Sequence, residues 1–125
     1  MNLSILENAG INTSELMHTL LDNEDVLKAV LDKFLADKNY NELKRLFSCE
    51  QSDMDYKAVE LYAHTLKGAS ATLEMSELHI CLQGLVDDVR AGKYDKLKKD
   101  FEVVTVEYNK IREAILEWKK VEEVS

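Results

Sequence analysis

Apolar residues recur at three- and four-residue spacing along most of the chain, the period of an amphipathic α-helix. A patch after Asn12 predicts a short first helix that stops at Asp22-Asn23. The next apolar set predicts a helix over 24–36. Leu43, Leu46 and Phe47 extend its pattern, so we expect one long helix, kinked near Asn39.

Three more helices follow the polar segment Glu50-Gln51-Ser52-Asp53. Asp55 can cap a helix that runs to about Leu73. The next begins near Ser76 and stops at Ala91-Gly92, where glycine supplies a left-handed exit. The last carries apolar residues four and three apart: Leu97, Phe101, Val104, Tyr108, Ile111, Ile115 and Trp118. We therefore expect an all-α fold, an antiparallel four-helix bundle with a short extra N-terminal helix.

Composition agrees with a helical chain, since there is no proline and there are only four glycines. With 125 residues the chain is expected to be a single domain, 1–125. Cys49 and Cys81 are far apart and lack metal-ligand spacing, so we expect reduced core thiols. The heptad spacing over 97–118 also fits a coiled-coil dimer, but its aromatic residues are bulky for a two-stranded seam and favour a monomer.

The charge pattern argues against some partners. The formal net charge is -8, and the lysines are scattered among acidic residues, which disfavours nucleic-acid binding. The first ten residues lack the basic start and apolar run of a signal peptide, and no apolar run is long enough to span a membrane. We expect a cytoplasmic protein with no membrane partner.

His64 falls on the outward face of the helix expected over 55–73. The inward face is apolar or small: Val59, Tyr62, Ala63, Leu66, Ala69, Ser70 and Leu73. At about 100° per residue, His64 lies about 140° from Val59, with Gly68 at about 180° and Ala71 at about 120°. The imidazole is therefore expected to stand on a nearly flat surface.

This arrangement suits phosphoryl chemistry. A neutral imidazole nitrogen is a usable nucleophile. Lys67, three residues on, can place a cation near phosphoryl oxygens, and Gly68, unfavourable inside a helix, leaves room for another molecule. The plainer interpretation is a solvated histidine beside an ordinary surface lysine and an incidental glycine.

The stretch AHTLKGASATLE, residues 63–74, resembles the phosphorylation motif of histidine-containing phosphotransfer (HPt) domains, a His-x-Leu-Lys-Gly-x-Ser/Ala core followed by a Leu. The resemblance covers roughly residues 10–118, outside the motif mainly by helix order and apolar pattern. It implies that His64 is phosphorylated, that Lys67 stabilises the phosphoryl group and that Gly68 admits the partner. Ala71 and Leu61 would belong to the same docking surface.

Two positions depart from that family. Glu74 stands where glycine is usual. A left-handed Glu would cost about 1 kcal/mol, so we expect the helix to run on or turn differently. Val86 stands where many members have a Gln that hydrogen-bonds the imidazole, and Gln83, one turn earlier, is the candidate to orient the ring in its place.

The resemblance implies a phosphocarrier of a multistep phosphorelay rather than an enzyme. Its partners would be response-regulator receiver domains and a hybrid sensor histidine kinase. It would need no cofactor of its own, because Mg²⁺ is expected on the receiver. The alternative is a helical interaction module that binds a receiver or another signalling protein without being phosphorylated, which Glu74 and Val86 keep open.

The other histidines offer weaker sites. His18 sits in LMHTLL without a following Lys and Gly, and is expected at the boundary of the first helix. Glu15 and His18 have the spacing of a di-iron motif, but a second copy is missing, so we expect no metal. His79 is expected to be a partly buried helix residue.

Overall fold

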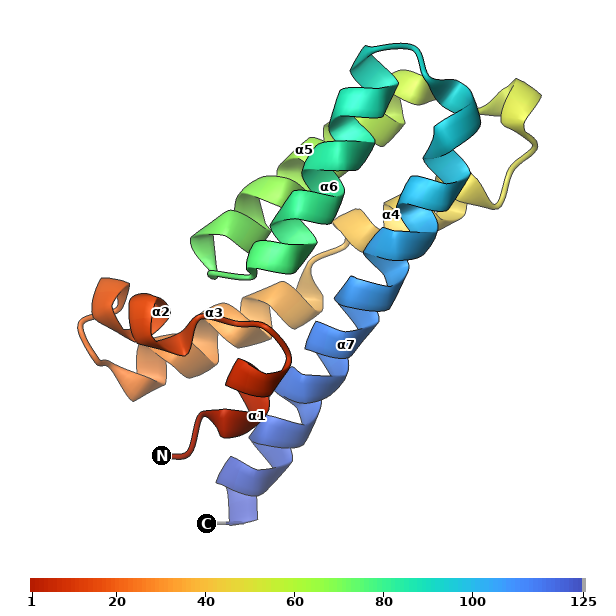
Figure 1. The fold of residues 1–125 in the computed structure, drawn as a ribbon. Helices are drawn as coiled ribbons and strands as arrows, with labels where there is room; N and C mark the ends of the chain where they lie inside the picture. The colour runs from red at the N-terminus through yellow and green to blue at the C-terminus, as the bar shows by residue number, and fades with distance from the viewer. Residues whose placement is uncertain (125) are drawn as a thin grey trace.

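The chain is all-helical in the computed structural model, which describes residues 1–124 (Figure 1). The α-helices are α1 (Ser4–Asn8), α2 (Thr13–Thr19), α3 (Glu24–Ala36), α4 (Asn39–Phe47), α5 (Tyr56–Thr72), α6 (Ser76–Arg90) and α7 (Leu97–Val124), with 3-10 turns η1 (Gln51–Asp53) and η2 (Tyr94–Lys96). Over these residues, extended pairing is limited to one isolated bridge between Ile11 and Met75.

The helices pack around α5, α6 and α7. α5 and α6 form an antiparallel hairpin, α7 lies along α6, and α4 packs on α5 (Figure 1). α1 contacts α7, and the two termini lie at the same end of the molecule. Lys119 of α7 pairs with Asp32 of α3. The long last helix is therefore contacted by two segments from the N-terminal part of the chain, α1 and α3.

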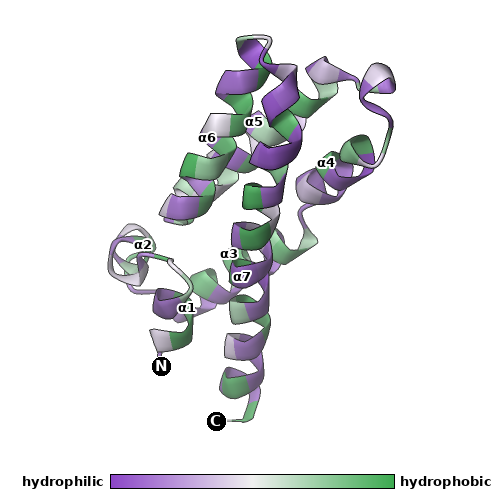
Figure 2. Cartoon of the chain, turned by 45° about the vertical axis from the view of Figure 1, so that its right-hand side comes forward, coloured by the Kyte–Doolittle hydropathy of each residue, from purple (hydrophilic) through white to green (hydrophobic). Residues whose placement is uncertain are grey.

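The core follows the predicted apolar faces. All seven residues of the seam in the last helix are buried, from Leu97 to Trp118, and apolar and polar residues alternate around α7 in Figure 2. The seam of α7 thus faces its own chain.

Within 1–124, no helix combines the length and the apolar character needed to cross a membrane.

Aromatic rings join α3 and α4 to α7. The rings of Tyr40 and Tyr108 stack with centroids 3.9 Å apart, and those of Phe47 and Phe101 are 4.5 Å apart. The hydroxyl of Tyr40 donates to Oγ1 of Thr105 at 3.1 Å. Burial raises the pKa of the Tyr108 hydroxyl. These contacts account for the bulky residues in the seam.

The expected single long helix over 24–47 is wrong, because α3 ends at Ala36 and α4 begins at Asn39. Asp37 adopts an extended conformation, and its Oδ1 accepts from the backbone N of Asn39 at 2.7 Å and from Nδ2 of Asn39 at 2.8 Å. The carboxylate thus satisfies the backbone N–H of the first residue of α4, which would otherwise have no partner within the helix. The break therefore lies just before the predicted kink.

Helix α1 was not predicted. It has five residues, too few for a helix that is stable alone. Leu6 is fully buried, and Nε1 of Trp118 donates to the backbone O of Asn2 at 3.2 Å. Contact with α7 therefore holds this segment.

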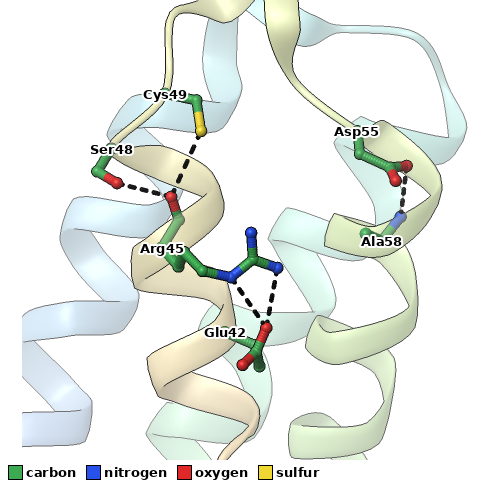
Figure 3. Close-up of polar contacts among 6 residues, drawn as sticks. All are labelled: Glu42, Arg45, Ser48, Cys49, Asp55 and Ala58. Atoms are coloured by element: carbon green, nitrogen blue, oxygen red, sulfur yellow. Dashed lines mark hydrogen bonds and ion pairs between the residues drawn. The ribbon is translucent and has the colours of Figure 1, made fainter.

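Cys49 is not a core residue, contrary to expectation. It is exposed just after α4, with its Sγ 3.7 Å from the carbonyl O of Arg45 (Figure 3). Cys81 is half-buried at the edge of the core, and burial, with a smaller contribution from the charge of Glu107, raises the pKa of its thiol. Both thiols are free.

The ends of α5 follow the polar signals in the sequence. Oδ1 of Asp55 accepts from the backbone N of Ala58 at 3.1 Å, which confirms the predicted cap (Figure 3). In the same view, the exposed Arg45 and Glu42 form an ion pair on α4. This cap fixes the residue at which α5 begins.

The expectation that the helix runs on or turns differently at Glu74 is wrong. The helix stops at Thr72, and Glu74 adopts a left-handed conformation with φ 59°. Backbone N–H groups of Glu74 and Met75 donate to the carbonyls of Ala71 and Ser70, the pattern of a Schellman cap. The chain therefore turns as a glycine would turn there, despite the cost to Glu74.

Candidate functional site

His64 lies in the middle of α5 with its side chain exposed. Ala63, which precedes His64, and Leu66, two residues after it, are fully buried. The predicted outward orientation is therefore confirmed, and its cause is the apolar phase of α5.

The surface around His64 carries little side-chain bulk. Gly68 and Ala71 are exposed one and two turns further along α5. A β-carbon built on Gly68 would meet no atom within 4 Å. Leu61 is 59% exposed. These four residues, His64, Leu61, Gly68 and Ala71, form what we call the α5 face, and the imidazole stands on it unobstructed.

A hollow borders the α5 face where α3 meets α5. Its lining includes Val30 and Phe34 from α3, and Gly68 and Thr72 from α5. Gly68 belongs both to the lining of this hollow and to the α5 face. A partner side chain could therefore reach apolar surface next to the imidazole.

Lys67 is joined to α6 by a short chain of hydrogen bonds. Its Nζ donates to Oε1 of Gln83 at 2.9 Å, and Nε2 of Gln83 donates to Oδ1 of Asp87 at 2.7 Å. Lys67 and Gln83 are half-buried, and Asp87 is exposed. The ammonium of Lys67, three residues after His64, is thus already held by a contact with α6.

The backbone of Lys67 is also anchored. Its carbonyl oxygen accepts from Oγ of Ser70 at 2.7 Å, and Nδ1 of His79 on α6 lies 3.3 Å from the same oxygen. For that contact to be a hydrogen bond, Nδ1 of His79 must carry the proton. His79 is half-buried, as expected, and it supports α5 from α6.

A second link between α5 and α6 lies on the other side of His64. Nε of Arg90 donates to Oε2 of Glu60 at 2.8 Å. Glu60 precedes His64 by one turn, and Arg90 follows Asp87 by three residues. Because Arg90 is exposed and Glu60 is partly exposed, this pair contributes little to stability, but it leaves the charges on that side balanced.

The imidazole of His64 makes no hydrogen bond or ion pair with any residue in 1–124. Val86, at the position where the resemblance would place a Gln, is fully buried. Gln83 was the predicted substitute, but the hydrogen bonds of its amide go to Lys67 and Asp87. The structure therefore brings Gln83 to the site in contact with Lys67 rather than with the ring.

The remaining candidates lie elsewhere. His18 is exposed in the last turn of α2, as predicted for a boundary residue. Throughout the described part of the chain, no three His, Cys, Asp or Glu side chains are grouped closely enough to hold a metal ion. Glu15 and His18 belong to no such group.

Sequence reasoning missed Asp87 and the pair Glu60–Arg90. Asp87 follows Gln83 by four residues, a spacing that places two side chains together on a helix, so that contact had a local signal. The contacts from α6 to Lys67 and Glu60 had none, since they depend on how α5 and α6 pack.

Comparison with protein-family models, with curated proteins and with solved structures found no match to this chain.

Proposed function

We propose that this chain is a histidine phosphotransfer protein of a multistep phosphorelay, with His64 as the phosphorylated residue. The observation that carries the proposal is an exposed imidazole on a helix face that Gly68 leaves open, with Lys67 three residues along the same helix and its ammonium held by Gln83. In this proposal, α3 with α4, α5, α6 and α7 correspond to the four helices of an HPt-like bundle, and the chain works in the cytoplasm.

The chemistry needs little from the chain itself. A ring nitrogen of His64, proposed to be Nε2, would attack the phosphorus of a receiver's aspartyl phosphate in line. The N–P bond forms as the acyl-phosphate P–O bond breaks, and the receiver's carboxylate leaves. The proton on the other ring nitrogen stays in place. The reverse reaction passes the phosphoryl group to a second receiver, and Mg²⁺ would belong to the receiver.

The α5 face is the docking surface of this proposal. Leu61 offers exposed apolar area, and Gly68 and Ala71 let the partner approach the ring closely. The charge of Lys67 would compensate the phosphoryl oxygens, since a charge-assisted hydrogen bond is about twice as strong as a neutral one. Hybrid sensor kinases and response regulators are the proposed sources of such receivers.

The test is transfer from a panel of phosphorylated receiver domains to the purified chain. We expect phosphate that is labile in acid and stable in base, located at His64 by mass spectrometry.

Failure of every receiver to label the chain, combined with tight receiver binding, would favour the second candidate. That candidate is a non-phosphorylated interaction module, and the observation in its favour is the lack of a partner to orient the His64 ring within residues 1–124.

A further inference from the structure

The chain of side chains from Lys67 to Asp87 suggests a role for two α6 residues. We propose that Gln83 and Asp87 are positioning residues that hold the Lys67 ammonium beside His64 for phosphoryl transfer. This inference rests on the proposed function. It differs from the role expected for Gln83 from the sequence, because the group that Gln83 contacts is the lysine and not the imidazole.

The orientation of the Gln83 amide is set by its two neighbours. A carboxylate only accepts hydrogen bonds and an ammonium only donates them. The amide NH₂ must therefore face Asp87, at 2.7 Å, which leaves the carbonyl oxygen to face Lys67, at 2.9 Å. The opposite orientation would set donor against donor and acceptor against acceptor. Asp87 thus makes Gln83 an acceptor for Lys67.

A neutral acceptor suits this task. The ammonium of Lys67 has three N–H donors, and Gln83 occupies one, so two stay available to phosphoryl oxygens. An amide restricts the flexible lysine side chain without cancelling its charge. Asp87, which would cancel it, contacts Lys67 only through Gln83. The other cation nearby on α6, Arg90, pairs with Glu60.

The effect on His64 follows from spacing on α5. Residues three apart on a helix are surface neighbours, so Lys67 lies next to His64. With Gln83 in place, the ammonium is already ordered when the ring is phosphorylated. Without it, Lys67 samples many rotamers in solvent and contacts the phosphoryl group for less of the time.

The experiment uses phosphoramidate as the phosphoryl donor, so that no receiver is needed. The His64 N–P bond forms as the donor's P–N bond breaks and ammonia leaves. Loss of the group to water is then followed by ³¹P NMR for the parent, Lys67→Ala, Gln83→Met and the double variant. Gln51→Met is the matched control, because Gln51 lies in η1 and is exposed.

We expect Lys67→Ala and Gln83→Met each to shorten the half-life of the phosphohistidine severalfold. The double variant should lose phosphate no faster than Lys67→Ala alone, since Gln83 acts through Lys67. Gln51→Met should match the parent. The positioning role would be overturned if the effects of the two substitutions on the half-life were additive, or if Gln83→Met left the half-life unchanged. It would also be overturned if Gln83→Met lengthened the half-life, since Gln83 would then be holding Lys67 away from the phosphoryl group.

A second measurement needs no phosphorylation. In ¹H–¹⁵N spectra of lysine Nζ groups, the unmodified parent should show a protected Lys67 ammonium that is lost in Gln83→Met and in Asp87→Ala. A Lys67 signal that both variants leave unchanged overturns the inference. If phosphoramidate fails to label His64 while the Lys67 signal responds as expected, the proposed function has failed. A role for Gln83 in phosphoryl transfer then fails as well, because it depends on that function. If His64 is labelled but the signal does not respond, only the positioning role has failed.

Discussion

Gly68 lies one helical turn beyond His64 on the exposed side of α5, and a side chain added at Gly68 would enter open space. Gly68→Gln should therefore stabilise the isolated chain by up to about 1 kcal/mol, because Gln is the better helix former. The same side chain would stand beside the imidazole and obstruct a receiver. Thermal midpoint and receiver-to-chain transfer, measured on one sample, should move in opposite directions.

Two controls accompany that variant. Gly68→Ala should obstruct less, and Gly84→Gln should stabilise α6 similarly, since Gly84 is also exposed with no atom within 4 Å of an added β-carbon. A Gly68→Gln protein that is more stable and still transfers at the parental rate would refute the docking role of the α5 face.

Substitution of each of the three histidines should show which one accepts the phosphoryl group. His64→Gln should fold normally, because its side chain is exposed, and should accept no phosphoryl group from any receiver. His18→Gln should leave acceptance intact, since His18 lies on α2. His79→Gln should also leave it intact, though its contact with the Lys67 carbonyl predicts a small loss of stability. Acceptance that survives in His64→Gln would move the nucleophile to another residue.

Glu74 offers a gain in stability. Glu74→Gly should raise the free energy of unfolding by about 1 kcal/mol, because glycine adopts φ 59° without strain. For a chain of this size that corresponds to roughly 3–6 °C in thermal midpoint. Glu74→Ala removes the charge but keeps the β-carbon, so it should give no such gain. Equal midpoints for the Gly and Ala variants would show that the left-handed turn carries no strain.

The raised pKa of Asp100 predicts how the stability of the folded chain depends on pH. Burial, followed by the nearby carboxyl of Asp88, raises the pKa of Asp100 to about 6, and Oδ2 of Asp100 is buried without a hydrogen-bond partner in residues 1–124. An unfolded Asp titrates near about 3.9. Between these values the folded chain binds more protons than the unfolded one, so this carboxyl's contribution to stability falls as pH rises from about 4 to about 6.

Asp100→Asn should remove that dependence. Its amide can donate to Asp88 at every pH, so the variant should gain stability relative to the parent as pH rises to 7. Denaturant titrations at pH 4, 5, 6 and 7 measure the difference. Asp95→Asn, on the exposed turn η2, is the matched control. A parent-to-variant difference that is constant over this range would contradict the predicted carboxyl pair.

The sequence by itself determined the local features of this protein. Apolar spacing predicted α5, α6 and α7 and the buried seam of α7, because a helix with one apolar face has one way to bury it. Asp55 and Gly92 marked ends that the structure confirms, since a cap acts within one turn of backbone. The same helical phase placed His64 outward.

Tertiary structure decided what depends on contacts between distant segments. α1 is held by α7, and the left-handed Glu74 is held where its carbonyl accepts from the backbone N of Asn12 at 3.0 Å. The link from Lys67 to Gln83, and the approach of Asp100 to Asp88, each join residues of different helices. Such pairs follow from the register in which helices pack, and periodicity within a single helix carries no information about that register.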